Sequence, residues 1–232
     1  MDRIDKIICN QTGYTRKEVK RILHKKRVEV NGQVIVDSDY KVDLGKDRIT
    51  IDHEELQIKE YVYFILNKPK GYVSATKDNK DITVLELVPE EYRHRDLFPA
   101  GRLDKDTTGL MLITDDGKFA HEILSPKKHV KKSYLVTIDQ MMTQDMVDHF
   151  KKGIFLKEGL TKPAELEIID EHTGIITLTE GKYHQIKRMF LKEDSVVLEL
   201  KRIKMGNLSL PKDLEEGNCR ECTKEELKLI KE

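Results

Sequence analysis

Apolar positions in the first 55 residues change from a helical period to the alternating period of a strand. Isoleucines at helical spacing predict a first helix near the N-terminus. Thr15 with Glu18 predicts the capping box of a second helix, whose apolar face repeats as far as about Lys25. The Asn31-Gly32 pair between two alternating segments then predicts a β-hairpin, and a last short strand is predicted at 48–51. The pattern therefore predicts a self-contained domain of two helices and a hairpin over residues 1–55.

The rest of the chain alternates short apolar runs with polar breaks and helical segments. After a charged linker at 56–60, the larger domain is predicted to occupy residues 61–232. The strands predicted in it lie at 61–66, 110–113, 134–138, 166–169, 174–179 and 195–202. Helices are predicted at 118–124, at 141–152, within 181–192 and at 224–231, and a basic hinge is predicted at 127–132. Many antiparallel strands with interspersed helices indicate an α+β fold. We expect a mixed, mainly antiparallel sheet with flanking helices.

The charge balance does not by itself indicate a nucleic-acid partner. Lys+Arg and Asp+Glu number 42 each, so an argument for RNA binding must depend on local clustering. A basic cluster covers the second predicted helix, where Glu18 is the one acidic residue, while aspartates gather at 37–47. The cluster consists of Arg16, Lys17, Lys20, Arg21, Lys25, Lys26 and Arg27. It predicts contacts with RNA phosphates, and the alternative is an ordinary solvated helix face.

Several other classes of protein are disfavoured by the sequence. No apolar stretch approaches the roughly 18–20 residues that span a membrane, and the N-terminus lacks the apolar core of a signal peptide. Three cysteines are too few for a disulfide framework. Cys219 and Cys222 lack the second ligand pair that a structural zinc needs. We therefore predict a cytoplasmic protein with reduced thiols, no membrane association and no metal.

Three polar residues stand at positions where the pattern alone favours an ordinary structural role over a chemical one. Asp104 lies in a polar loop just before a buried strand, where an aspartate often makes only a local turn. Tyr134 opens a strand, as half-buried tyrosines do. Lys187 stands beside Arg188 on a charged helix. Composition and spacing alone leave both interpretations open for each residue.

Taken together and in order, these segments resemble the RsuA-type branch of RNA pseudouridine synthases, which modify ribosomal RNA. Gly101-Arg102-Leu103-Asp104 resembles the motif of the active-site aspartate. Residues 131–134 resemble the tyrosine motif, and residues 180–190 resemble the motif that carries a basic residue. The first domain resembles the S4 RNA-binding domain, notably at 26–32. The resemblance covers nearly the whole chain.

The resemblance implies roles for the matching residues. Asp104 would be the essential carboxylate, Tyr134 would stack on the reacting base and assist removal of its C5 proton, and Lys187 would pair with Asp104. A nearby cation favours the ionised form of a desolvated carboxylate. The substrate-binding residues implied beside them are Arg102, His184, Gln185 and Ile186. For Arg102, a structural salt bridge is an equal alternative to phosphate binding.

The implied reaction breaks the C1′–N1 bond of a uridine and rejoins the base through C5, with no metal or other cofactor. Attack by the aspartate on C1′, attack on C6, and abstraction of the C2′ proton all stay open. The uridine must be flipped out of its stack. Lys187 and Thr108 resemble the small-subunit enzymes, whereas large-subunit relatives more often have arginine and serine there. We therefore predict a monomer that acts on 16S rRNA or a small-subunit assembly intermediate. The alternatives are a 23S rRNA synthase of the same branch and a non-catalytic S4-domain ribosome-binding or assembly protein.

Overall fold

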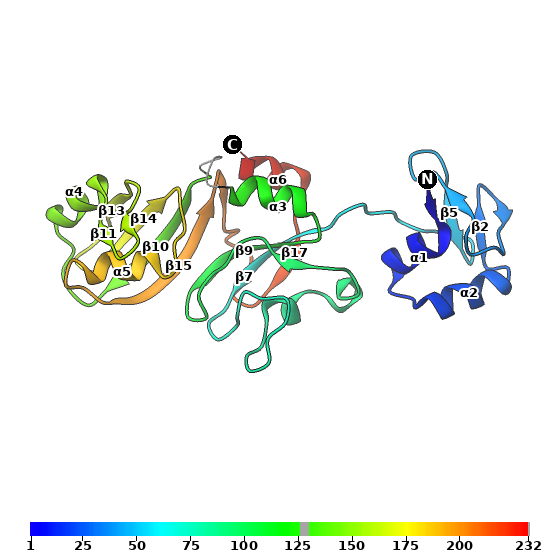
Figure 1. Ribbon diagram of the computed structural model, residues 1–232, viewed down its shortest axis with the longest axis horizontal. Coiled ribbons are helices and arrows are strands. Elements are labelled where there is room, and N and C mark those ends of the chain that lie inside the picture. The colour runs from blue at the N-terminus through cyan, green and yellow to red at the C-terminus, as the bar shows by residue number, and fades with distance from the viewer. Residues whose placement is uncertain (126–129, 232) are drawn as a thin grey trace. The chain divides into compact units, whose positions relative to one another are not determined.

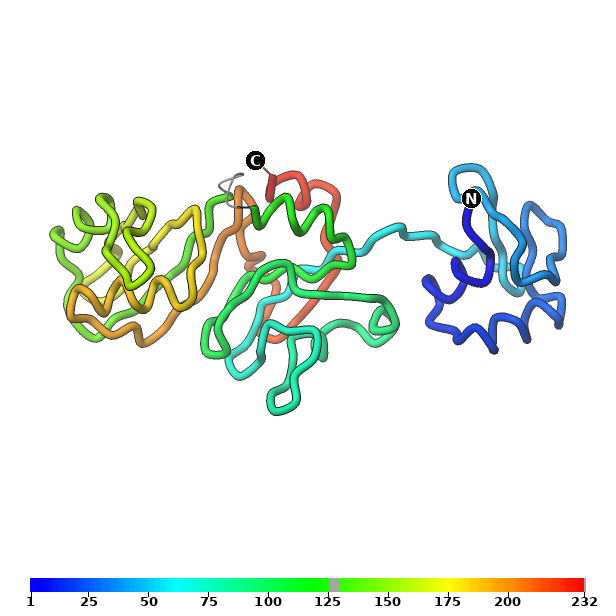
Figure 2. The backbone as a smooth tube through the Cα atoms, in the orientation of Figure 1, coloured from blue at the N-terminus to red at the C-terminus, as the bar shows by residue number. Residues whose placement is uncertain are grey.

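The computed structural model describes residues 1–125 and 130–231 and divides the chain into two compact units (Figures 1 and 2). The first unit comprises Met1–Val62 and Pro89–Asp96, and the second comprises Tyr63–Val88 and Leu97–Glu232. Within the described ranges, no helix combines the length and apolar character needed to cross a membrane.

The first unit contains the two predicted helices and the predicted hairpin. Its elements are β1 (Asp2–Arg3), α1 (Ile4–Thr12), α2 (Arg16–His24), β2 (Val28–Val30), β3 (Gln33–Val34), β4 (Lys41–Val42), β5 (Ile49–Ile51), β6 (Glu54–Glu55) and a 3-10 turn at Glu90–Tyr92. The capping box is confirmed, because Thr15 accepts from the Glu18 amide while Glu18 accepts from the Thr15 amide at 2.8 Å. Asn31 and Gly32 both have positive φ, as the predicted tight hairpin turn requires.

The core of this unit is built from the apolar faces seen in the sequence. The isoleucines of α1 pack with Val19, Ile22 and Leu23 of α2 and with the inner residues of the small sheet. The sheet extends one strand further than the prediction, because β6 pairs with β5 through Thr50 and Glu55. Two glutamates form this edge strand through their backbones while their side chains stay exposed, so no apolar alternation marks it in the sequence.

The second unit is built around one large sheet. Its elements are β7 (Tyr63–Lys68), a 3-10 turn at Val84–Leu87, β8 (Phe98–Pro99), β9 (Thr108–Thr114), α3 (Gly117–Leu124), β10 (Lys132–Ile138), α4 (Gln144–Lys152), β11 (Phe155–Leu156), β12 (Gly159–Leu160), β13 (Glu165–Ile168), β14 (Thr173–Leu178), α5 (Gln185–Leu191), β15 (Val197–Met205), β16 (Leu208–Ser209), β17 (Cys219–Glu221) and α6 (Lys224–Lys231). The strand order is β13-β14-β10-β15-β9-β7-β17, with β16 beside β15 and β8 beside β9. The pairings are antiparallel except for the short parallel contact of β15 with β9. The predicted α+β class is confirmed.

The parallel contact joins the two halves of the sheet and depends on a glycine. Gly109 lies opposite Arg202 there, with φ +96°. A Cβ atom at this position would lie 2.3 Å from the carbonyl oxygen of Arg202. Only glycine allows β9 to approach β15 this closely. The approach brings the loop before β9 next to β10, where Tyr134 lies.

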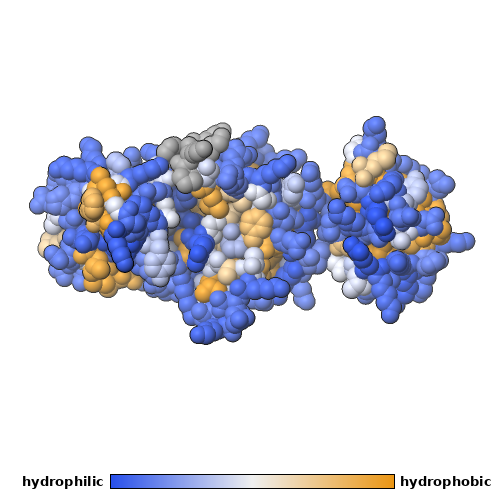
Figure 3. Space-filling model, in the orientation of Figure 1, coloured by the Kyte–Doolittle hydropathy of each residue, from blue (hydrophilic) through white to orange (hydrophobic). Residues whose placement is uncertain are grey.

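Helices cover each half of the sheet (Figure 1). α3 and α6 lie together over β7 and β9, where Phe119, Ile123 and Ile230 share one core with Ile65 and Leu112. α4 and α5 cover the other half. The rings of Phe150 in α4 and Phe190 in α5 form an edge-to-face pair, with their centroids 4.9 Å apart. In the view of Figure 3 the surface is mostly hydrophilic, with apolar side chains gathered in patches over the second unit. This agrees with the 36% of charged residues in the chain.

Several boundaries in this unit differ from the prediction, including those of α4 and β15. The helix predicted from Met141 begins at Gln144, because Thr143 is extended and its hydroxyl caps the helix by accepting from the Met146 amide. β15 starts later than predicted and continues to Met205. Of the predicted basic hinge, residues 127–129 lie outside the described residues, and Lys132 already belongs to β10.

Three short strands of the large sheet, β8, β16 and β17, were not predicted. β17 pairs with β7 through Cys219 and Leu66, so the Cys-x-x-Cys segment serves as an edge strand. Burial raises the pKa of the Cys219 thiol to about 12, and it also raises the pKa of the Cys222 thiol. Thiols held protonated in this way are unreactive.

Candidate active site

The loop between β8 and β9 presents Asp104 to a cavity of about 450 Å³. The loop closes in a tight turn, in which the Thr107 amide donates to the Asp104 carbonyl at 3.1 Å. Leu103, the residue before Asp104, is buried. The Ser74 hydroxyl accepts a hydrogen bond from the Leu103 amide and donates one to the Leu103 carbonyl. The side chain of Asp104 is 28% exposed, so the carboxylate stands at the cavity with limited access to water.

A buried lysine holds this loop from below. Lys68, at the end of β7, is 0% exposed. No role was predicted for its side chain. The three N–H groups of its Nζ are shared among four carbonyl oxygens: those of Thr107 (2.8 Å), Asp104 (3.1 Å), Pro69 (3.1 Å) and Lys105 (3.3 Å). Burial lowers the pKa of Lys68 to about 8, although nearby carboxylates oppose the shift. The side chain therefore ties the strand to the loop that carries Asp104.

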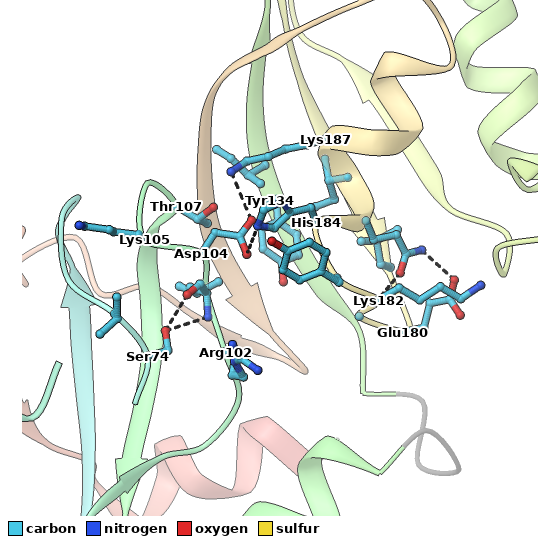
Figure 4. Close-up of a pocket in the computed structure, with 18 of the residues that line it drawn as sticks. Ser74, Arg102, Asp104, Lys105, Thr107, Tyr134, Glu180, Lys182, His184 and Lys187 are labelled. Atoms are coloured by element: carbon cyan, nitrogen blue, oxygen red, sulfur yellow. Dashed lines mark hydrogen bonds and ion pairs between the residues drawn. The ribbon is translucent and has the colours of Figure 1, made fainter. Parts of the chain in front are cut away.

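Lys187 of α5 and His184 in the loop before it face the carboxylate of Asp104 (Figure 4). Lys187 Nζ lies 3.2 Å from Asp104 Oδ2 and 2.6 Å from Asp106 Oδ1. His184 Nε2 lies 3.5 Å from Asp104 Oδ1. Burial opposes the charge on Lys187, but the two aspartates outweigh it and raise the pKa of this lysine. The predicted pairing of Lys187 with Asp104 is present, and Asp106 shares the same cation.

The remaining walls of the cavity bring together every other residue that the sequence suggested for the second unit. Tyr134 and Ile186 line it and are largely buried, with 9% and 5% exposure. Arg102 also lines it and is exposed, and its binding of phosphate stays a prediction. Gln185 lines it as well. Residues distant in the sequence thus converge on one site.

Gln185 is engaged in holding the loop that precedes α5. Its Nε2 donates to Glu180 at 2.7 Å, and its Oε1 accepts from the Lys182 amide at 2.9 Å. These bonds fix residues 180–185 as a closed loop at the rim of the cavity. Direct contact of Gln185 with substrate stays a prediction.

The comparisons with known proteins agree with this geometry. The pattern of the RNA pseudouridylate synthase family matches residues 62–192, and that of the S4 domain matches residues 2–49. The chain belongs to the RNA pseudouridylate synthase family. The predicted enzyme class and the presence of an S4 domain are thereby confirmed.

Relatives from this family match over almost the entire chain. Ribosomal small subunit pseudouridine synthase A of Escherichia coli (strain K12) is 41% identical, with 97% of this chain and 98% of that protein covered. The uncharacterised RNA pseudouridine synthase YtzG of Bacillus subtilis (strain 168) is 40% identical, with 99% and 98% covered. A crystal structure of a pseudouridylate synthase is 36% identical with a TM-score of 0.70, over 99% of this chain and 100% of that one. The resemblance to the RsuA-type branch is confirmed.

The S4 unit presents most of the predicted basic cluster to solvent. Six of its seven members are exposed: Arg16, Lys17, Lys20, Arg21, Lys25 and Lys26. The seventh, Arg27, forms a two-bond ion pair with Asp52. The acidic residues are also less separate than the sequence suggested, because Asp37 and Asp39 line the same small groove as Lys20. Phosphate contact by the cluster stays a prediction, and Arg27 is its least available member.

Lys68→Met should reduce turnover, because it removes the side chain that anchors the loop carrying Asp104. We expect kcat to fall by about 10- to 100-fold, because misplacing a reacting group by about 1 Å can cost about 100-fold. The wild-type kcat should also fall as the pH rises through about 8, where the folded protein releases the Lys68 proton. Tritium release from C5-labelled uridine at pH 6 to 10 measures both effects.

The neighbouring lysine provides the matched control. Lys70 is exposed and makes only a surface pair with Glu199 at 3.3 Å, so Lys70→Met should follow the wild type at every pH. Lys68→Met should lack the decline above pH 8. An unchanged kcat in Lys68→Met would mean that the loop keeps its shape without this anchor.

Proposed function

We propose that this chain converts a uridine to pseudouridine in the ribosomal RNA of the small subunit. The observation that carries the proposal is the carboxylate of Asp104, which lies at the cavity, is paired with Lys187 and shares the cavity wall with Tyr134. The small subunit is supported by relatives of 41% identity that are named ribosomal small subunit pseudouridine synthase A. The resemblance that Lys187 carries at the basic position points to the same subunit.

The reaction requires no net exchange of groups other than protons. The C1′–N1 bond breaks, the uracil turns over, and a C1′–C5 bond forms. The C5 proton is lost to solvent through a base, and N1 gains a proton. Asp104 acts in its ionised form at the sugar–base junction. Attack on C1′, attack on C6 and removal of the C2′ proton all begin from this carboxylate.

The surroundings of Asp104 suit this chemistry. Lys187 stabilises the negative charge of the aspartate in a partly desolvated site. Tyr134 and Ile186 offer an aromatic and an aliphatic wall for the uracil ring. Arg102, exposed at the same cavity, is placed to bind a phosphate of the flipped nucleotide. We assign Tyr134 as the group that assists loss of the C5 proton.

RNA binding by the S4 unit should depend on exposed cations of α2. Replacing Lys17 and Arg21 with alanine should weaken RNA binding and reduce the slope of log K against log salt by up to about two, one for each lost phosphate contact. Filter binding to small-subunit rRNA between 50 and 400 mM salt measures the slope. Replacing Lys41 and Lys46, exposed lysines of the same unit outside α2, should leave it nearly unchanged. Equal slopes for the two double variants would exclude a specific role for α2.

The proposed activity is tested by tritium release from C5-labelled ribosomal RNA. We expect about one equivalent of tritium per 16S rRNA, from naked RNA or from a small-subunit assembly intermediate, and none from 23S rRNA. Carbodiimide modification and primer extension would then locate one new pseudouridine. Release from 23S rRNA would keep the chemistry and overturn the subunit assignment. No release from either RNA, free or in particles, would overturn the proposal.

A further inference from the structure

We propose that the exposed ring of Tyr183 is a stacking site for the RNA base next to the target uridine. The inference rests on the proposed function, since it assigns a second base-binding position at the same cavity. Tyr183 lies just before α5, the helix that carries Lys187. No role was predicted for it from the sequence.

Tyr183 has the geometry of a platform with one open face. Its ring is stacked on the His184 ring, with centroids 3.8 Å apart and planes inclined by 19°. The residue is nevertheless 73% exposed and lines the cavity. One face of the tyrosine is therefore covered by the imidazole, and the rest of the ring is presented to solvent. Nucleic-acid bases bind such aromatic faces by stacking, with little dependence on sequence.

The Tyr183 ring is linked to the carboxylate of Asp104 through His184. The His184 ring that supports Tyr183 also places Nε2 3.5 Å from Asp104 Oδ1. A base stacked on Tyr183 would thus be one stacked ring and one polar contact away from Asp104. This separation suits a nucleotide adjacent to the flipped uridine.

The backbone holds this arrangement at some cost. His184 has φ +47°, a left-handed conformation that non-glycine residues adopt rarely. The preceding loop is fixed by Gln185 and by Lys182, whose Nζ donates to the Leu160 carbonyl at 3.3 Å. Strained backbone maintained by its surroundings is characteristic of functional sites. Here it directs the imidazole toward Asp104 while stacking it on Tyr183.

Base flipping supplies the physical need for such a site. Extruding a uridine breaks its stacking with the adjacent bases, at a cost of a few kcal/mol. An aromatic ring at the rim of the cavity gives one adjacent base a new partner and so lowers the cost of extrusion. The proposed ligand is any nucleobase that directly flanks the target.

Kinetics separate a platform from a residue that only supports His184. With labelled small-subunit rRNA, Tyr183→Leu should raise KM by about 30-fold, the middle of the range for loss of one stacked base. Its kcat should change much less, because stacking on a flanking base is present before and during the reaction. Tyr183→Phe keeps the ring and should retain a KM within about twofold of wild type. A fall in kcat with unchanged KM in Tyr183→Leu would show that the ring acts through His184 and would overturn the proposal.

The absence of tryptophan from the chain allows a direct binding test. Tyr183→Trp introduces a single tryptophan, whose fluorescence should be quenched by a stacked base when rRNA binds. Phe155→Trp, at another exposed aromatic of the same unit that does not line the cavity, is the matched control and should be quenched little. Equal quenching at both positions, or none at position 183, would overturn the stacking site. Tritium release by the wild-type protein from the same rRNA tests the proposed function separately. A failure of the proposed function can therefore be told apart from a failure of the stacking site.

Discussion

Asp104→Asn is expected to reduce pseudouridine formation by about 10⁴-fold or more, as removal of a nucleophile or essential base commonly does. The amide has nearly the same shape as the carboxylate but carries no charge and cannot take a proton or form a covalent bond in any of the three routes. Lys187 and the loop hydrogen bonds of Lys68 to backbone carbonyls would persist. The substitution therefore removes the chemistry while leaving the site in place.

The decisive measurement is single-turnover tritium release by Asp104→Asn at saturating enzyme, with RNA binding and the urea midpoint recorded in parallel. Asp106→Asn is the control within the same loop, since Asp106 shares Lys187 but its side chain is 67% exposed. We expect that variant to retain turnover within about tenfold of wild type, as for an outlying charge. Normal turnover by Asp104→Asn would remove Asp104 from the mechanism and return the chain to the non-catalytic ribosome-binding alternative.

Local features of the fold were accessible from the sequence because the residues that cause them are neighbours in the chain. The capping box of Thr15 with Glu18 and the turn at Asn31-Gly32 act over two to four residues, and both are present. The buried strand after Asp104 was equally clear, since all of β9 is buried. Edge strands such as β6 and β17 escaped because backbone pairing with a distant strand, rather than an apolar period, defines them.

The candidate site shows the same division. Asp104, Tyr134 and Lys187 were named from the family resemblance, and the structure brings them to one cavity. Lys68 and Tyr183 were missed because their significance is set by the fold: a lysine at the end of a strand becomes a loop anchor only when four carbonyls converge on it. The one available signal was the continuation of a buried strand into Asn67-Lys68, where polar residues must find partners.

Lys187→Met is the second large effect that we expect, with kcat lowered by about 100- to 1,000-fold, the scale of losing one electrostatic contact in an active site. Methionine keeps the length of the side chain and removes the charge that Asp104 and Asp106 share. The two carboxylates would then lose the cation that lies between them. RNA binding should be preserved, because Lys187 is bound to these aspartates within the second unit. Lys187→Arg keeps the charge and should retain kcat within about tenfold.

The same substitution should change the pH dependence of stability in a defined direction. Burial opposes ionisation of Asp106, but Lys187 outweighs it and lowers the pKa of that carboxyl, so its stabilising contribution exists above about pH 4 and is lost as the pH falls. The raised pKa of Lys187 gives a contribution that is complete below about pH 10 and is lost as the pH rises further. The difference in unfolding free energy between wild type and Lys187→Met should therefore be largest between about pH 4 and 10 and shrink on both sides. Urea unfolding across this range tests it. A difference independent of pH would mean that Lys187 contributes by packing, and full turnover by Lys187→Met would show that Asp104 does not need the cation.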